Sequence, residues 1–225
     1  DDKSSDKTLQ IAKSFSNKKI KIYSLKKHKG RTNALNYGLK KCKSEYIAIL
    51  DADDVSFPNR LIKQLSFFKK NKNIKMVASW AIKIDKFNKK IGEIKTSNIV
   101  PERNINLLMS KEFIPHSTVM FKLSYGRKYG GYPNYLKYAQ DFGLILKFIE
   151  KKQLKIIPFF LSKIRFTPGS MSFRDEYKKI IIQDRLNLLN YVKKKFYLNK
   201  IDIIKYYFYI LKVYLKLLII FFKRL

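Results

Sequence analysis

The sequence predicts an α/β fold in which a mixed sheet is flanked by helices and followed by a helical C-terminal extension. Helical patterns alternate with short apolar strand patterns through the first half of the chain, which is typical of an α/β sandwich. Two long helical patterns follow one another at the C-terminal end without a strand between them. A length of 225 residues is enough for one domain with a short appendage. We therefore expect a main domain over 1–173 and a helical extension over 174–225.

The individual elements follow from the spacing of apolar residues and from helix start signals. Ser56 and Pro58 mark the beginning of one helix, because both residue types favour its first turn. The segment KFNKK separates two apolar runs and predicts the turn of a hairpin. The predicted helices lie at about 9–15, 32–41, 56–70, 102–110, 140–151, 174–196 and 200–224. The predicted strands lie at about 20–25, 45–50, 76–84, 91–94, 117–121 and 154–166.

The charge balance of the chain is unusual. Lys and Arg number 49 against 17 Asp and Glu, a formal net charge of +32. Such an excess suggests an anionic partner, namely nucleic acid, acidic lipid headgroups or a phosphorylated substrate, although AT-rich coding accounts for part of it. A single cysteine, Cys42, excludes an internal disulfide and fits a reducing compartment. With His28 and His116 as the only histidines, the sequence has no Cys/His pattern for zinc.

Three carboxylates stand within four residues, directly after the apolar run IAIL. Asp51, Asp53 and Asp54 therefore lie at the carboxyl end of a predicted strand, where α/β sheets bind ligands. Carboxylates this close repel one another unless a cation neutralises them. Asp51 and Asp53 point the same way along an extended turn and can share a hard divalent cation, Mg²⁺ or Mn²⁺, with substrate phosphates. The alternative is an acidic turn in which Asp54 or Ser56 caps the next helix.

Basic residues gather in the loop Lys26–Arg31, which contains Gly30 and leads into a predicted helix. Side-chain charge and backbone N–H groups at a helix N-terminus can hold a diphosphate; a solvated turn is the alternative. A second acidic cluster, Asp1, Asp2 and Asp6, stands at the beginning of the chain. The chain begins there without a Met, so we expect it to be a fragment of a longer protein.

The order of these segments resembles the family 2 glycosyltransferases of the GT-A fold, a Rossmann-like fold of nucleotide-diphospho-sugar transferases. The opening DDKSSDKT resembles that family's DDxSxD segment, and GRTNALNYGLKKCKSEYIAILDADD resembles its phosphate-side loop, helix and DxD strand. The segments HSTVMF, GGY, AQDFGLILK and IRFTPGSMS follow in the family's order. The resemblance extends over roughly residues 1–175 and implies that the family's first strand lies upstream of Asp1.

The resemblance implies transfer of a sugar from a nucleotide-diphospho-sugar to an acceptor hydroxyl, with inversion at the anomeric carbon. By resemblance, Asp2 holds the base or ribose of the nucleotide, and Asp51 lies on the nucleoside side. Asp53 binds Mn²⁺ or Mg²⁺, which offsets charge on the departing diphosphate, and Arg31 lies near that diphosphate. Asp141 matches the catalytic base that takes the acceptor proton.

Three further residues are expected on the acceptor side by the same resemblance: His116, Gly131 and Gln140. Gln140 stands where Glu is common in the family, directly before the expected base. His116 is also explained as a structural residue before an apolar strand, and Gly131 as part of a turn.

The C-terminal helix is nearly all apolar from Ile203 to Phe222, which is long enough to span a bilayer. Four lysines interrupt it at spacings of 7, 4 and 7 residues, and they fall within about 20° of one line. They are Lys205, Lys212, Lys216 and Lys223. Because mid-helix lysines disfavour spanning, we expect the helix to lie in the interface of an anionic membrane. Packing against protein and spanning are the alternatives.

Together these features predict a metal-dependent glycosyltransferase, peripheral at the cytoplasmic face of the cell membrane, acting in cell-envelope glycan synthesis on a glycan or lipid-linked acceptor. A nucleotidyltransferase is an alternative, since such enzymes also place acidic residues and a metal on an α/β sheet. A nucleic-acid or anionic-surface binding module is the second alternative, suggested by the charge of +32. The sequence contains no aromatic and basic RNP-like segment, so we expect no nucleic-acid partner.

Overall fold

The computed structural model describes residues 1–97, 114–167 and 175–222. Its centre is a mixed sheet, in the order β1-β5-β3-β6-β2, with β4 paired to the other side of β3. The strands are β1 (Tyr46–Ala48), β2 (Val55–Ser56), β3 (Met76–Ile84), β4 (Lys90–Ile94), β5 (Met120–Lys122) and β6 (Leu154–Arg165). Among the described strands, β3 and β6 pair in parallel, and the other pairs are antiparallel. The predicted α/β fold with a mixed sheet is confirmed.

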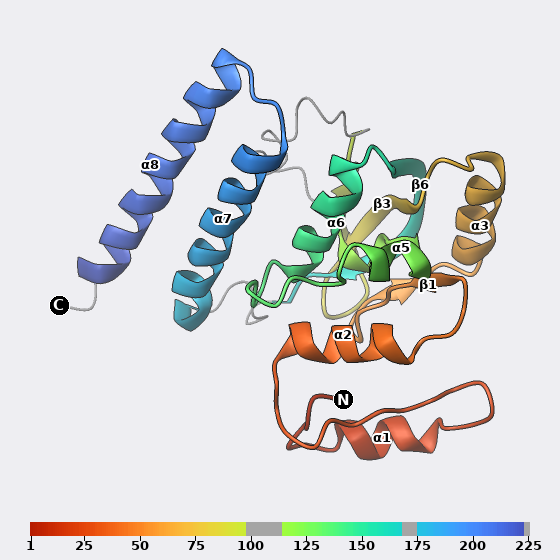
Figure 1. Ribbon diagram of the computed structural model, residues 1–225. Helices are drawn as coiled ribbons and strands as arrows, with labels where there is room; N and C mark the ends of the chain where they lie inside the picture. The colour runs from red at the N-terminus through yellow and green to blue at the C-terminus, as the bar shows by residue number, and fades with distance from the viewer. Residues whose placement is uncertain (98–113, 168–174, 223–225) are drawn as a thin grey trace.

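Helices cover both faces of this sheet (Figure 1). Successive residues of β3 point to opposite faces: Met76 and Ala78 join the core beneath helix α6, whereas Val77 packs on the side of helix α3. The side chains of β6 alternate between the two faces in the same way, with Ile156 on the α6 side and Ile157 on the α3 side. The helices are α1 (Thr8–Ser14), α2 (Arg31–Lys41), α3 (Arg60–Lys70), α5 (Leu123–Lys128), α6 (Gln140–Glu150), α7 (Asp175–Lys195) and α8 (Lys200–Phe222).

Two expectations about strands are wrong in detail. Residues 20–25 form no strand: the extended chain there makes only two backbone bonds with Asp1, from the Asp1 amino group to the Tyr23 carbonyl and from the Leu25 N–H to the Asp1 carbonyl. Two bonds are too few for a ladder. The segment expected as a strand at 117–121 begins with a 3₁₀ turn, η2 (His116–Thr118), and β5 follows it. The helix expected at 102–110 lies outside the described residues.

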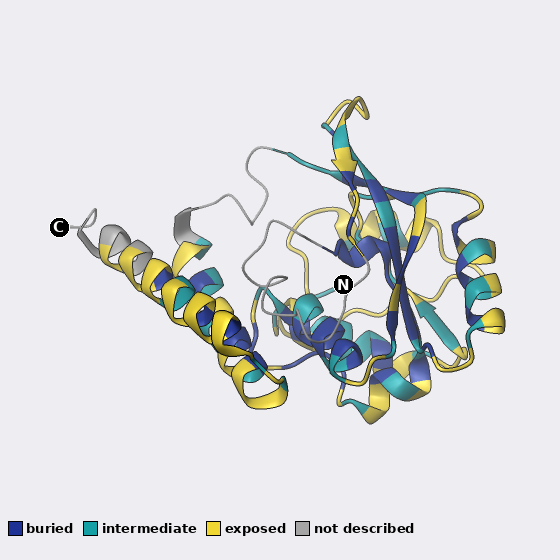
Figure 2. Cartoon of the chain, turned by 90° about the horizontal axis from the view of Figure 1, so that it is seen from above, coloured by how far each residue is buried: buried dark blue, intermediate teal, exposed yellow. Residues whose placement is uncertain are grey.

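The two C-terminal helices lie side by side as an antiparallel pair at one end of the molecule (Figure 1). Leu188 and Val192 of α7 belong to the same core as α6, while α8 packs on α7 through Tyr206 and Leu189. The outer face of α8 is exposed (Figure 2). Within the described part of the chain, no helix combines the length and apolarity needed to cross a bilayer. The division of the chain at 173/174 stays a prediction.

Candidate active site

The acidic segment, Asp51–Asp54, leads from β1 to β2, and its two ends are hydrogen-bonded to different elements, η2 and β6. The Asp51 N–H donates to Ser117 Oγ (2.9 Å) in η2. Further along, Asp54 Oδ1 accepts the backbone N–H of Arg165 (2.9 Å) at the end of β6. The Asp54 N–H closes the turn by donating to the Asp51 carbonyl (3.1 Å). The three carboxylates are therefore held at the edge of the sheet where the sequence predicted a ligand site.

Asp51 is the charged centre of this region. Arg31, the first residue of α2, donates from Nη2 to both Asp51 carboxylate oxygens at 2.9 Å. His116 Nδ1 lies 3.6 Å from Asp51 Oδ1, which is an electrostatic contact but too long for a hydrogen bond. Burial raises the pKa of Asp51, but His116 and the Arg31 guanidinium lower it by more, so the net pKa is below its usual value. Asp51 is thus held as an anion.

Asp141 belongs to the same electrostatic cluster. It lies in the first turn of α6, where its Oδ1 accepts the N–H of Phe142 (2.8 Å). Burial lowers the pKa of Arg31, but the carboxylates of Asp51 and Asp141 raise it by more. Burial also raises the pKa of Tyr132, and the negative charges of Asp141 and Asp51 raise it further. The fold therefore brings one cation and two carboxylates together from α2, the acidic segment and α6.

His116 and Tyr132 form a buried pair beside this cluster. The two rings meet edge to face, and His116 Nε2 lies 3.0 Å from the Tyr132 hydroxyl. His116 Nδ1 is buried without a hydrogen-bond partner among the described residues, and it faces Asp51 at the 3.6 Å distance given above. Tyr132 carries a proton throughout the physiological range because its pKa is raised. His116 is therefore placed against Asp51 by a neutral phenol.

Asp2 contacts the basic loop that precedes α2. Its carboxylate accepts the N–H groups of Lys29 (2.8 Å) and Gly30 (2.7 Å), and His28 Nδ1 lies 3.0 Å from Asp2 Oδ2. Gly30 has φ = 85° and precedes α2, a conformation that disfavours side chains with a Cβ. This turn directs the N-terminus of α2, and with it Arg31, toward the acidic segment.

Asp53 is exposed, whereas the other two carboxylates of the turn, Asp51 and Asp54, are half-buried. Its backbone carbonyl accepts Arg165 Nε (2.8 Å), and the rest of that guanidinium bonds to the Asp85 carbonyl and to Asn88 Oδ1 at 2.8 Å each. Arg165 thus fixes the backbone of the acidic turn and leaves the Asp53 carboxylate toward solvent. Within the described ranges, no group of three or more His, Cys, Asp or Glu is arranged to hold a metal alone. A site with one or two carboxylates fits a hard divalent cation that takes its remaining ligands from substrate phosphates and water.

The remaining two residues expected on the acceptor side are packed differently from each other. Gly131 has φ = 64°, and a Cβ there would lie 2.5 Å from Asn36 Oδ1. Its carbonyl accepts Lys147 Nζ (2.9 Å), so Gly131 holds its loop against α2 and α6. Gln140 is fully buried at the start of α6, and both polar atoms of its amide lack a partner among the described residues.

Helix α3 contributes two buried polar side chains that bond to the backbone next to the site. Arg60 is 1% exposed and donates from Nη2 to the Val119 carbonyl (3.1 Å), while Gln64 Nε2 donates to the Thr118 carbonyl (2.7 Å). Burial lowers the pKa of Arg60 to about 10, which leaves it charged at neutral pH. These two side chains fix the backbone that follows His116 and Ser117.

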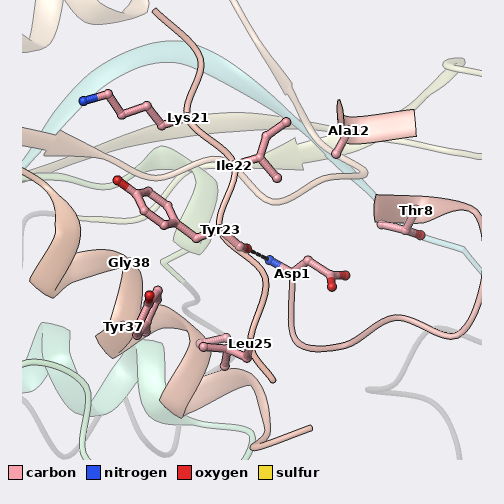
Figure 3. A pocket seen from close by; sticks show the side chains of 10 residues that line it. Asp1, Thr8, Ala12, Lys21, Ile22, Tyr23, Leu25, Tyr37 and Gly38 are labelled. Carbon is pink, nitrogen blue, oxygen red and sulfur yellow. Dashed lines mark hydrogen bonds between the residues drawn. The ribbon is translucent and has the colours of Figure 1, made fainter. Parts of the chain in front are cut away.

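A separate pocket of about 380 Å³ lies between α1, the segment 21–25 and α2 (Figure 3). Its lining is mostly apolar, with Ile22, Tyr23, Leu25 and Tyr37 around it. None of the residues of the charged cluster described above lines this pocket. The charged cluster and this pocket are therefore separate features of the molecule.

Sequence reasoning missed Tyr132, Ser117 and Asn36 as site residues. Tyr132 is the last letter of the GGY segment, whose glycines alone were singled out. Asn36 accepts the Tyr132 N–H at Oδ1 (2.9 Å) and donates to the Tyr132 carbonyl (2.8 Å). These contacts join residues 96 positions apart, so no local pattern points to them.

The comparison with protein families gives this geometry a context. The family described as "Glycosyl transferase family 2" matches residues 1–129, which is more than half of the chain. The chain belongs to glycosyl transferase family 2. The match includes Asp2, Arg31, the acidic segment and His116, and the resemblance predicted from the sequence is confirmed.

Curated relatives of this family 2 glycosyltransferase come from several organisms. An uncharacterized glycosyltransferase, MJ1057 of Methanocaldococcus jannaschii, is 28% identical over 96% of this chain and 75% of its own length. The putative glycosyltransferase EpsE of Bacillus subtilis is 34% identical over 67% of this chain. A UDP-Gal:alpha-D-GlcNAc-diphosphoundecaprenol beta-1,3-galactosyltransferase of Escherichia coli is 35% identical over 57% of this chain. The matches to these last two span about half of each relative, 55% and 46% of its length.

Among solved structures, Staphylococcus aureus TarS 1-349 in complex with UDP is similar to this glycosyltransferase with a TM-score of 0.59. The similarity covers 83% of this chain and 55% of that one at 18% sequence identity. A likeness at this identity establishes the fold alone. The GT-A fold predicted from the sequence is confirmed.

Proposed function

We propose that this chain is an inverting, metal-dependent glycosyltransferase that moves a sugar from a nucleotide-diphospho-sugar to a hydroxyl of a glycan or lipid-linked acceptor. The observation that carries the proposal is the convergence of Arg31, Asp51 and Asp141 in one electrostatic cluster. In a single in-line displacement the attacking hydroxyl and its base lie on one side of the anomeric carbon and the leaving diphosphate lies on the other, so acceptor-side and donor-side groups have to face each other. Names such as the undecaprenyl-diphosphate galactosyltransferase of E. coli support a role in cell-envelope glycan synthesis.

The donor end of the site follows from the contacts of Asp2 and Arg31. Asp2 fixes the loop N–H groups that precede α2, and the positive end of that helix favours an anionic ligand. Arg31 is held at the Asp51 carboxylate, so a diphosphate arriving there gains a guanidinium partner already in place. Asp53 is the ligand that we assign to Mn²⁺ or Mg²⁺, because its carboxylate is exposed beside these groups. Such a cation, when bound, offsets charge on the departing diphosphate.

The acceptor end is assigned to Asp141. Its carboxylate lies in the first turn of α6, on an element other than those that carry Arg31 and Asp51. The anion accepts the proton of the attacking hydroxyl, which forms the new bond to the anomeric carbon as the bond to the diphosphate breaks. A single displacement of this kind inverts the anomeric configuration. His116, Gly131 and Gln140 remain predicted acceptor-side residues.

The test combines binding and turnover on the same variants. We expect one nucleoside diphosphate among UDP, GDP, ADP, CDP and dTDP to raise the melting temperature only with Mn²⁺ or Mg²⁺ present. Asp53→Asn abolishes that metal-dependent rise. Asp141→Asn keeps it but lowers sugar transfer by at least about a hundredfold. Glu93→Gln, which removes a surface carboxylate on β4, is the matched control and leaves both properties unchanged.

Undiminished transfer by Asp141→Asn would contradict the assigned base. Release of inorganic diphosphate in place of a nucleoside diphosphate would identify the chain as a nucleotidyltransferase. A basic binding module would show nucleic-acid affinity that falls steeply with salt and no turnover of any nucleotide sugar.

We also propose that α8 binds an anionic membrane at the cytoplasmic face, as a peripheral attachment. One face of α8 is buried against α7, with Asp202, Tyr206 and Val213 inside. At about 100° per residue, the exposed described residues on the opposite face from Ile203 onward are apolar or aromatic over an arc of roughly 140°. Exposed Lys205 and Lys212 border this arc on one side, and exposed Lys200 stands at its N-terminal end. The exposed residues of this α8 apolar face are Ile203, Ile204, Tyr207, Phe208, Leu211, Tyr214, Leu215 and Leu218. Apolar side chains with a lysine border match the acyl boundary and the anionic headgroups of a bilayer.

A further inference from the structure

A buried carboxylate of α7 reaches the loop that leads into α6. Asp184 is 2% exposed, and its Oδ2 accepts the backbone N–H groups of Lys137 (2.9 Å), Tyr138 (2.7 Å) and Ala139 (3.0 Å). Ala139 is the N-cap residue of α6, and Asp141 is the second residue of that helix. The Asp184 carboxylate is therefore hydrogen-bonded to the backbone shortly before the proposed base, Asp141.

Three consecutive N–H groups that converge on one oxygen form an anion-binding concavity. An ionised carboxylate satisfies it with charge-assisted hydrogen bonds, and its negative charge also suits the N-terminus of α6. Ala139 has no side-chain oxygen, and α6 has no side-chain hydrogen bond at its own N-cap. Asp184 thus binds, from α7, the backbone N–H groups of the three residues that immediately precede α6.

A second contact fastens the other end of α6 to the same helix. Tyr191 donates its hydroxyl to Glu150 Oε2 (2.5 Å), and Glu150 is the last residue of α6. Asp184 and Tyr191 are seven residues apart, so they lie on one face of α7. Leu188 lies between them and packs into the core that contains α6. The two helices lie next to each other along this face (Figure 1), and α7 holds α6 at both ends.

We propose that Asp184 is a positioning residue for the transfer reaction: it fixes the first turn of α6 and so sets where the Asp141 carboxylate stands relative to Arg31 and Asp51. The proposal rests on the proposed function, in which Asp141 is the base. Asp184 does not contact substrate; it acts through the backbone of Lys137–Ala139. A displacement of the base by about 1 Å is enough to cost on the order of a hundredfold in rate.

The experiment uses the full chain and two readouts. In Asp184→Asn, we expect backbone amide hydrogen exchange at 137–142 to accelerate by more than about tenfold, because the anionic acceptor is lost. We also expect kcat to fall on the order of a hundredfold, with the KM of the donor sugar nucleotide unchanged, and with unchanged binding stoichiometry of the nucleoside diphosphate and metal that raise the melting temperature in the screen described above. Asp202→Asn is the matched control, since Asp202 is a buried carboxylate of α8, 5% exposed, and it changes neither readout.

Tyr191→Phe separates positioning from general loosening of α7, because it removes only the contact at the far end of α6. It keeps normal kcat; a loss as large as that of Asp184→Asn would overturn the proposal. Slow exchange at 137–142 in Asp184→Asn would also overturn it, and so would accelerated exchange with full turnover. Should Asp184→Asn not fold, Asp184→Glu carries the same test, since its longer side chain displaces the loop. Full turnover by Asp141→Asn would instead reject the proposed base, while the exchange result at 137–142 stands by itself.

Discussion

At the scale of single residues, the ionisation of Asp51 links the site to the stability of the fold. Its folded-state pKa lies below its ordinary value because His116 and Arg31 outweigh the effect of burial. A lowered carboxylate pKa contributes stability above the unfolded pKa of about 3.9, and this contribution is lost as pH falls through the folded value. The ionised form of Asp54 instead reduces the stability of the fold at neutral pH, because burial raises its pKa.

We therefore predict that lowering the pH from about 6 to about 3 destabilises the wild type more than Asp51→Asn. The difference in the loss of unfolding free energy is about 1 kcal/mol, a modest value because the Arg31 pair is partly exposed and screened. Urea denaturation at each pH measures it. Parallel losses in the two proteins would show that Asp51 is not a stabilising anion.

Gly130 and Gly131 allow a matched test of packing near the site. Both have positive φ, at 76° and 64°, but an added Cβ meets no atom within 4 Å at Gly130, whereas at Gly131 it meets Asn36 Oδ1 at 2.5 Å. We predict that Gly130→Ala costs about 1 kcal/mol through backbone strain and that Gly131→Ala costs about 1–2 kcal/mol more through loss of the Asn36 contacts. Chemical denaturation measures both; equal costs would mean that Asn36 moves aside freely.

The residues with chemical function divide into those that motifs reveal and those that only the fold reveals. Arg31, Asp51 and Asp141 stand in recognisable segments, and the structure brings all three into one cluster. Tyr132 contacts His116, 16 positions away in the sequence. Asp184 contacts backbone groups that lie 45–47 positions away. No periodicity encodes such contacts, because they depend on how α2, α6 and α7 pack.

At the scale of elements, α8 makes the membrane proposal testable. We predict that the full chain binds vesicles containing phosphatidylglycerol and that Lys205→Gln and Lys212→Gln each weaken binding about fivefold, the equivalent of about 1 kcal/mol per charge near the surface. Leu211→Ser weakens binding further by removing apolar area from the α8 apolar face. Vesicle co-sedimentation measures the partition.

Ile62→Ser is the control for that experiment, since Ile62 is a 70% exposed residue of α3, away from α8. It leaves vesicle binding unchanged. If Leu211→Ser, Lys205→Gln and Lys212→Gln bind vesicles as strongly as the unchanged chain, any membrane contact lies elsewhere on the molecule.

Elements with a long, regular pattern were predicted well, and short ones were not. The amphipathic spacing of α3 and α6 and the apolar runs of β3 and β6 gave their positions to within a few residues. The alternation at 20–25 also predicts a strand, but a strand needs a neighbouring ladder, and only Asp1 pairs with that segment among the described residues. Elements such as β2, with two residues, are formed by their partner strand and carry no pattern of their own.

At the scale of the whole molecule, the two C-terminal helices differ in what they support. Helix α7 contributes Leu188 and Val192 to the main core and Asp184 to the α6 loop, whereas α8 is packed on α7. We predict that a chain ending at residue 199 stays folded with a cooperative thermal transition, while a chain ending at residue 173 does not. Circular dichroism melting tests both chains. A cooperative transition in the shorter chain would favour the division at 173/174 as a true domain boundary.

The sheet order has a consequence for how the protein is made. Strands β1 and β2 are separated by only six residues of sequence, yet they occupy opposite ends of the strand path. Val55 pairs with Lys163, and Asp54 bonds to Arg165, so the segment between the two strands has no final docking place until the ribosome has released residues beyond 165. Pairing between such distant positions forms late. The negatively charged turn is accordingly translated before β6, but it reaches its final position only after β6 has been made.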